Sequence, residues 1–291
     1  MSRPLTSMTS SPPNATPYSS STPSSLESHP YIQPESSDSR SPCPALNTLA
    51  NHGYIQRTGK DISFLELIDA LQHVYNLSWL LSLFLAVVGF LTSGKFTFSA
   101  PLRDPSRPDT WFTRIRDLVP IPRWTIELGS LSIRGPKKIA HDAAFVHPNY
   151  IQSHAPDGRL LTKLLSFASS CNHGPNKCGL SLVDMAHYHK ERERELSSPL
   201  NKFQQQVALG ECGLAWAVMR RRAKSMDRKG SSDSSLSERD DIITVDTIQR
   251  WFGCERLPDD WWVDGGSRPI ESVGLFEARR RANHVAKISS N

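Results

Sequence analysis

The sequence has few of the features that mark disulfide-rich, membrane-spanning or nucleic-acid-binding proteins. It contains only five cysteines, an odd and scattered set that makes a poor disulfide framework. Its apolar runs are shorter than the roughly 20 residues that a helix needs to cross a bilayer. Lys and Arg (34) barely outnumber Asp and Glu (29). No basic stripe is interleaved with aromatic residues, which argues against a dedicated nucleic-acid binder. Strand signals are also scarce, so the 291 residues predict a mostly α-helical protein.

Composition divides the chain into a central domain and two dissimilar ends. Residues 1–29 are rich in Ser, Thr and Pro and bury too little apolar surface to fold, so we expect a disordered tail. This segment lacks the apolar core of a secretory signal, which predicts an intracellular location. Residues 30–270 form the predicted single domain, with a loop insertion at 99–124 and a flexible polar linker at 223–241. Residues 271–291 form a basic C-terminal tail.

Capping residues and periodicity predict several helices in this domain. Ser63 and Glu66 form a capping box at the start of one helix, and Ser181 begins another with Asp184 at its third position. Further helical patterns cover residues 157–170, 200–222 and 245–252.

The most apolar part of the chain is residues 77–91. Its length of about 15 residues is short for a bilayer span. Two interpretations stay open: a helix buried in the core, or a segment that associates with a membrane.

Cys43 lies between two prolines, in the sequence Ser-Pro-Cys-Pro. Pro44 suits the first position of a helix, which places Cys43 at the N-cap, and Gly53 suits the end of that helix. Unpaired amides and the helix dipole stabilise a thiolate at this position. The pattern therefore predicts either a thiolate that serves as metal ligand or nucleophile, or a cysteine that only caps the helix.

The stretch HPYIQPESSDSRSPCPALNTLANHGYIQRTGKDIS around Cys43 resembles the proximal region of the fungal haem-thiolate peroxidases, namely chloroperoxidase and the short type of unspecific (aromatic) peroxygenase. The resemblance implies a helical haem-binding domain in which Cys43 is the axial ligand of haem b. It also implies oxidation, oxygenation or halogenation of a small organic substrate by hydrogen peroxide, for instance in fungal secondary metabolism. Thiolate ligation favours cleavage of the O–O bond.

Two further motifs match this family. The sequence around His141 and Asp142 resembles a Glu-His-Asp-Ala-Ser motif, and Gly210-Glu211 resembles a Gly-Glu pair in a long helix. By this resemblance Glu211 is the acid–base group for peroxide, and His141 and Asp142 orient it. A third match, Glu255-Arg256-Leu257-Pro258, implies structural packing behind the haem pocket.

One part of the second motif departs from the family. Ala140 and Ala144 replace a Glu and a Ser that help to hold a magnesium or manganese ion, so the resemblance makes Mg²⁺ or Mn²⁺ doubtful here. Lys137 or Lys138 could offset the charge of a haem propionate instead. The same two alanines leave a second interpretation open, a catalytically impaired relative that acts as a haem-binding or membrane-associated interaction protein.

Overall fold

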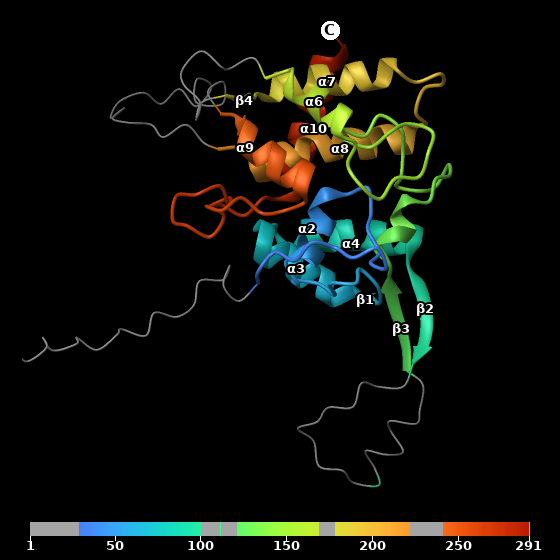
Figure 1. Ribbon diagram of the computed structural model, residues 1–291. Helices are drawn as coiled ribbons and strands as arrows, with labels where there is room; N and C mark the ends of the chain where they lie inside the picture. Colours follow the sequence, from blue (N-terminus) through green and yellow to red (C-terminus); the bar gives the residue numbers. More distant parts are fainter. Residues whose placement is uncertain (1–28, 100–110, 112–120, 169–177, 222–240, 291) are drawn as a thin grey trace, which may run out of the picture.

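The computed structural model describes residues 29–99, 111, 121–168, 178–221 and 241–290 (Figure 1). The expected tail, apart from His29, and the expected linker, apart from Asp241, lie outside the described residues. The helices are α2 (Pro44–Asn51), α3 (Phe64–Tyr75), α4 (Trp79–Ser93), α6 (Gly158–Leu165), α7 (Leu182–Arg194), α8 (Lys202–Met219), α9 (Val245–Ile248) and α10 (Leu275–Ser290), with a 3-10 helix η1 (Leu128–Ser132) and a π-helical turn η3 (Gln249–Gly253). The mostly helical fold is confirmed.

The described strands are short and lie at the margins of the helices. One antiparallel sheet has the order β1-β3-β2, and a second pairs β4 with β5. Their bounds are β1 (Ile62–Ser63), β2 (Lys95–Ser99), β3 (Ile121–Ile126), β4 (Gly179–Leu180) and β5 (Ile243–Thr244).

The hairpin of β2 and β3 differs from the loop expected over 99–124. Residue 99 and residues 121–124 lie in the two strands, while 100–110 and 112–120 lie outside the described residues. Phe96 pairs with Trp124 across the hairpin, and the Trp124 ring stacks between Phe96 (5.4 Å) and Phe64 (5.6 Å). This aromatic stack joins the hairpin to α3, and such cross-strand pairs stabilise a short sheet.

The helices form two groups (Figure 1). One contains α3, α4 and the larger sheet, and the other contains α6, α7, α8 and α10. Helix α2 lies where the groups meet and is hydrogen-bonded to the segment after η3. A continuous core runs through both, with Leu49 from α2, Tyr75 from α3 and Trp216 from α8 all fully or nearly fully buried.

The C-terminal segment 271–291 is part of this body. Residues Leu275–Ser290 form α10, which packs against α8 and α7 and buries Val285 and Arg281. Arg281 is only 3% exposed and lies 3.6 Å from the Glu277 carboxylate. The basic C-terminal segment expected from the sequence is thus helical over Leu275–Ser290, and one face of this helix carries the residues that dock it.

Helix α4, of 15 residues, has one buried side and one exposed side. It buries Leu81, Ala86 and Phe90, and it leaves Leu80, Phe84 and Leu91 exposed. Of the helices formed by the described residues, none combines the length and the apolarity that membrane crossing requires.

Candidate functional site

Cys43 occupies the amino end of α2. It is the N-cap residue with extended backbone (φ −97°, ψ 108°), and Pro44 follows at the first helical position, as the sequence predicts. The backbone amides of Leu46 and Ala45 at this helix end act to lower the pKa of the thiol. Burial nevertheless raises the pKa of the Cys43 thiol to about 12, and the helix-end amides lower it only in part. In the chain alone the thiol therefore favours its protonated form, whereas a bound metal ion deprotonates a coordinating thiol.

Buried amide side chains hold α2 in place. Asn47 accepts hydrogen bonds at Oδ1 from the Ser41 amide (2.8 Å), and its Nδ2 donates to the Ser41 carbonyl (2.7 Å) and to Glu255 Oε1 (2.6 Å). Asn51 Oδ1 accepts from Arg40 Nε (3.0 Å) and Nη2 (2.8 Å), and its Nδ2 donates to the Glu255 carbonyl (3.1 Å). The chain on both sides of the thiol is thus fixed by buried, hydrogen-bonded polar side chains.

Glu255 joins this clamp from the other end of the chain. It adopts a positive φ of 50°, a strained conformation that persists only when the surroundings determine it. Burial raises the pKa of its carboxyl to about 7, against the opposing effects of the Asn47 hydrogen bond and the Arg40 charge. These contacts support the structural role expected for the Glu255–Pro258 segment.

The described structure brings His141 and Glu211 together. His141 Nε2 lies 3.3 Å from Glu211 Oε2 on α8, and the imidazole side chain is 2% exposed whereas the carboxylate is 50% exposed. Burial alone lowers the pKa of His141, but the charge and hydrogen bond of Glu211 and a hydrogen bond to the Asp142 carbonyl raise it overall. The half-exposed Glu211 carboxylate therefore contacts a buried His141 imidazole whose protonated form is favoured.

Asp142 contacts His141 through its backbone and not through its carboxylate. His141 Nδ1 lies 2.5 Å from the Asp142 carbonyl oxygen, which can only accept, so Nδ1 carries the proton. The carboxylate oxygen Oδ1 accepts instead from the Tyr150 amide (2.6 Å) and from Arg134.

Cys43 lies within electrostatic reach of Glu211, the first at the start of α2 and the second on α8. The Glu211 charge raises the pKa of the Cys43 thiol, and it acts in the same direction on His147 and His189. Burial lowers the pKa of both histidines to about 4. Sequence reasoning missed these two residues as neighbours of the site, since nothing in the sequence near either one links it to Glu211.

The donor set fits a haem iron. The Cys43 thiol, a soft ligand, lies at the end of a helix. The partly exposed Glu211 carboxylate, which contacts His141, lies within electrostatic reach of this thiol. The same residues do not fit a hard cation. Within the described parts of the chain, no three His, Cys, Asp or Glu side chains are arranged to hold a metal ion, and Ala140 and Ala144 offer no side-chain oxygen.

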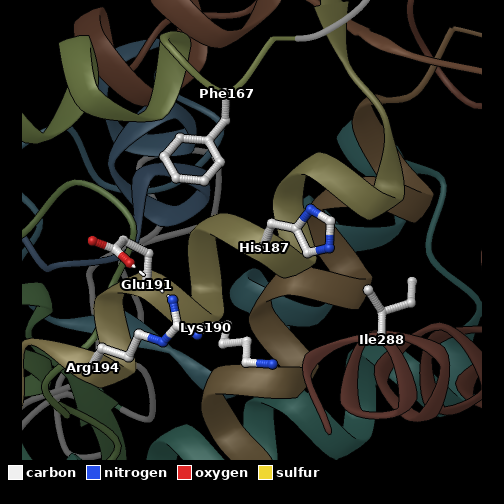
Figure 2. A pocket seen from close by; sticks show the side chains of 6 residues that line it. All are labelled: Phe167, His187, Lys190, Glu191, Arg194 and Ile288. Atoms are coloured by element: carbon white, nitrogen blue, oxygen red, sulfur yellow. Dashed lines mark ion pairs between the residues drawn. The ribbon is translucent and has the colours of Figure 1, made fainter. Parts of the chain in front are cut away.

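A surface pocket of about 590 Å³ lies elsewhere, on the outer side of α7 (Figure 2). It is lined by Phe167, His187, Lys190, Glu191, Arg194 and Ile288, and Glu191 and Arg194, one turn apart on α7, form an ion pair of 3.5 Å. None of the site residues expected from the sequence lines this pocket.

The sequence comparisons point to one family. A family model described as "Peroxidase, family 2" matches residues 29–264. The dothistromin biosynthesis peroxidase dotB of Dothistroma septosporum is 44% identical over 66 residues, which cover 23% of this chain and 16% of that protein. The chloroperoxidase of Leptoxyphium fumago is 65% identical over 34 residues, which cover 12% of this chain and 9% of that protein.

A third relative, the aromatic peroxygenase of Cyclocybe aegerita, is 36% identical over 69 residues, or 24% of this chain and 18% of that protein. The matched segments thus span less than a fifth of the length of each of these three relatives.

Proposed function

This chain belongs to peroxidase family 2, and from that premise we propose that it is a haem-thiolate peroxidase or peroxygenase. It uses hydrogen peroxide to oxidise, oxygenate or halogenate a small organic substrate. The observation that carries the proposal is the placement of the Cys43 thiol within reach of the Glu211 charge, with His141 behind the carboxylate. The name of the dothistromin biosynthesis peroxidase supports a role in fungal secondary metabolism.

Cys43 is the residue that would hold the iron of haem b through its sulfur. When bound, the haem supplies the redox chemistry with peroxide, and its thiolate ligand favours cleavage of the O–O bond. The amides of Ala45 and Leu46 at the end of α2 favour the thiolate and tune its basicity. The Asn47 and Asn51 clamp keeps the sulfur in one position.

Glu211 is the proposed acid–base group. Its half-exposed carboxylate accepts a proton from one oxygen of hydrogen peroxide and returns the proton to the other. His141 Nε2 holds the carboxylate, and the Asp142 carbonyl fixes the orientation of the imidazole. In this proposal Asp142 acts through its backbone, and its side chain supports the loop.

An absorption spectrum tests the proposal. The purified protein, reduced with dithionite under carbon monoxide, should give a strongly red-shifted Soret band. Cys43→Ala should lose this band, whereas Cys254→Ala, which removes an exposed thiol, should keep it. Glu211→Gln should keep the band and lose reactivity with peroxide by about 100-fold or more.

The results also separate the proposal from its alternative. A folded wild-type protein that takes up no haem would refute the enzyme and leave an interaction module. A wild type with the red-shifted band but no peroxide reactivity would favour the catalytically impaired relative, which the two alanines at 140 and 144 first raised.

We also propose that α4 associates with a lipid surface. Leu80, Phe84 and Leu91 share one exposed side of a helix without charged residues. Trp79 is exposed at its start, and Lys95 follows its end. Aromatic and basic residues at the ends of an apolar helix face are typical of interfacial helices.

Sedimentation with anionic vesicles tests this association. Phe84→Glu should reduce the bound fraction severalfold, and Val183→Glu, which changes a single exposed apolar residue on α7, should leave it unchanged. Equal binding of the wild type and Phe84→Glu would refute it.

A further inference from the structure

Arg134 holds the loop that carries the His141–Asp142 pair. Its backbone forms a bridge with Ala140. Its guanidinium donates to three oxygens: Asp142 Oδ1, the Pro148 carbonyl (3.1 Å) and the Ile151 carbonyl (2.9 Å). One carboxylate and two carbonyls are also the kind of oxygen set that a divalent cation gathers.

A second arginine engages the other end of the same loop. Arg192 on α7 is buried, and it donates to the carbonyls of Ala144 (3.0 Å) and His147 (3.0 Å) and to Asn149 Oδ1 (2.9 Å). The Ala144 carbonyl, which a cation could otherwise use, is therefore already taken by a guanidinium.

The sequence suggests two lysines, Lys137 and Lys138, and the structure gives a side-chain contact for Lys138. Lys138 Nζ donates to the Thr92 carbonyl near the end of α4. The positive charge next to Asp142 comes from Arg134, which forms an ion pair with its carboxylate.

We propose that the Arg134 guanidinium, assisted by Arg192, takes the structural place of a divalent cation, so that the His141–Asp142 loop is ordered without Mg²⁺ or Mn²⁺. A guanidinium suits this task because its planar fork donates to several oxygens at once and stays charged at every working pH.

Arg134 is in this view a positioning residue for the peroxide site. It fixes Asp142, the Asp142 carbonyl fixes the Nδ1 proton of His141, and His141 then presents Nε2 to Glu211. This consequence rests on the proposed function, whereas the metal independence of the loop does not.

The first test measures bound metal in the wild-type holoprotein. Elemental analysis after purification in the presence of Mg²⁺ and Mn²⁺ should find neither ion in stoichiometric amount. Neither EDTA nor added Mg²⁺ should change Tm. One equivalent of either ion, whose removal by EDTA lowers Tm, would overturn the proposal. These results stand whether or not the protein reacts with peroxide.

The second test uses Arg134→Gln. It should lower Tm by about 5 °C, because three hydrogen-bonded oxygens lose a charged donor. Arg159→Gln, which removes an exposed arginine, is the matched control. Adding Ala140→Glu and Ala144→Ser to Arg134→Gln should make Tm rise with Mg²⁺. An unchanged Tm in Arg134→Gln would overturn the proposal, and a variant that fails to fold leaves the wild-type metal analysis decisive.

The positioning role has its own readout. Arg134→Gln should keep its haem content and react with peroxide about 10-fold more slowly. Loss of haem in parallel with activity would show general structural damage instead and would contradict the positioning role. A wild type without any haem would refute the proposed function while leaving the metal and Tm results valid.

Discussion

Glu255 makes the stability of the protein depend on pH. Its carboxyl has an ordinary pKa of 4.5, and burial raises the pKa to about 7 in the folded protein. The folded state therefore binds more protons than the unfolded chain within this window, and the free energy of unfolding falls as pH rises through it. An interval of about 2.5 between the two pKa values corresponds to about 3 kcal/mol, all of it lost above the folded pKa.

Glu255→Gln removes this dependence while keeping an oxygen that accepts the Asn47 hydrogen bond. Urea unfolding near pH 5 and near pH 8 compares the free energies of unfolding of wild type and variant. The value for the variant minus the value for wild type should be about 2 to 3 kcal/mol larger near pH 8 than near pH 5. Glu35→Gln, at an exposed position, should track the wild type at both. If the difference in free energy of unfolding between wild type and variant stays constant with pH, Glu255 is ionised in the folded protein and the reasoning is wrong.

Four further substitutions test the packing and the site. Gly213→Ala places a Cβ about 2.6 Å from the backbone of α10 and should destabilise the protein by about 1–3 kcal/mol. In Gly210→Ala the added Cβ meets no atom within 4 Å, so this variant should stabilise α8 by about 1 kcal/mol. Thermal unfolding monitored by circular dichroism compares the two variants. Asn51→Ala leaves the Arg40 guanidinium without its buried acceptor and should cost about 3 kcal/mol in the same assay. The pairing with Glu211 that raises the pKa of His141 stabilises the protein below pH 6.5 and loses that effect as pH rises through the raised pKa, so the Tm advantage of wild type over Glu211→Gln should shrink from pH 6 to pH 9.

Local features of this fold could be predicted from the sequence. The capping boxes of Ser63 with Glu66 and of Ser181 with Asp184 are both present, and Cys43 caps α2. Each signal lies within four residues of the end that it marks, so no distant contact can overrule it.

Features that depend on distant contacts could not be predicted. The β2–β3 hairpin is stabilised by the ring of Trp124 between Phe96 and Phe64, and these partners are far apart in a Pro- and Arg-rich sequence. Arg281 looks like a solvated residue within a basic run, yet α8 and α7 bury it. In both cases tertiary packing overrides composition.

The candidate site shows the same division. The N-cap position of Cys43 follows from its two prolines, but the burial that raises its pKa comes from the rest of the molecule. The proximity of Glu211 and His141 followed from the family resemblance alone, because nothing in the local sequence joins two residues 70 positions apart. Arg134 gave no signal, since its partners are mostly backbone carbonyls.

The clamp between Asn47 and Glu255 joins residues that are 208 positions apart. On a ribosome that adds roughly 5–20 residues per second, the thiol-bearing segment leaves the exit tunnel about 10–40 s before the residues that secure it. During that interval Cys43 sits on an unanchored stretch that cellular oxidants and stray metal ions can reach. The segment around Glu255 must therefore fold back onto α2, and the thiol is held in a fixed direction only after that segment has been made.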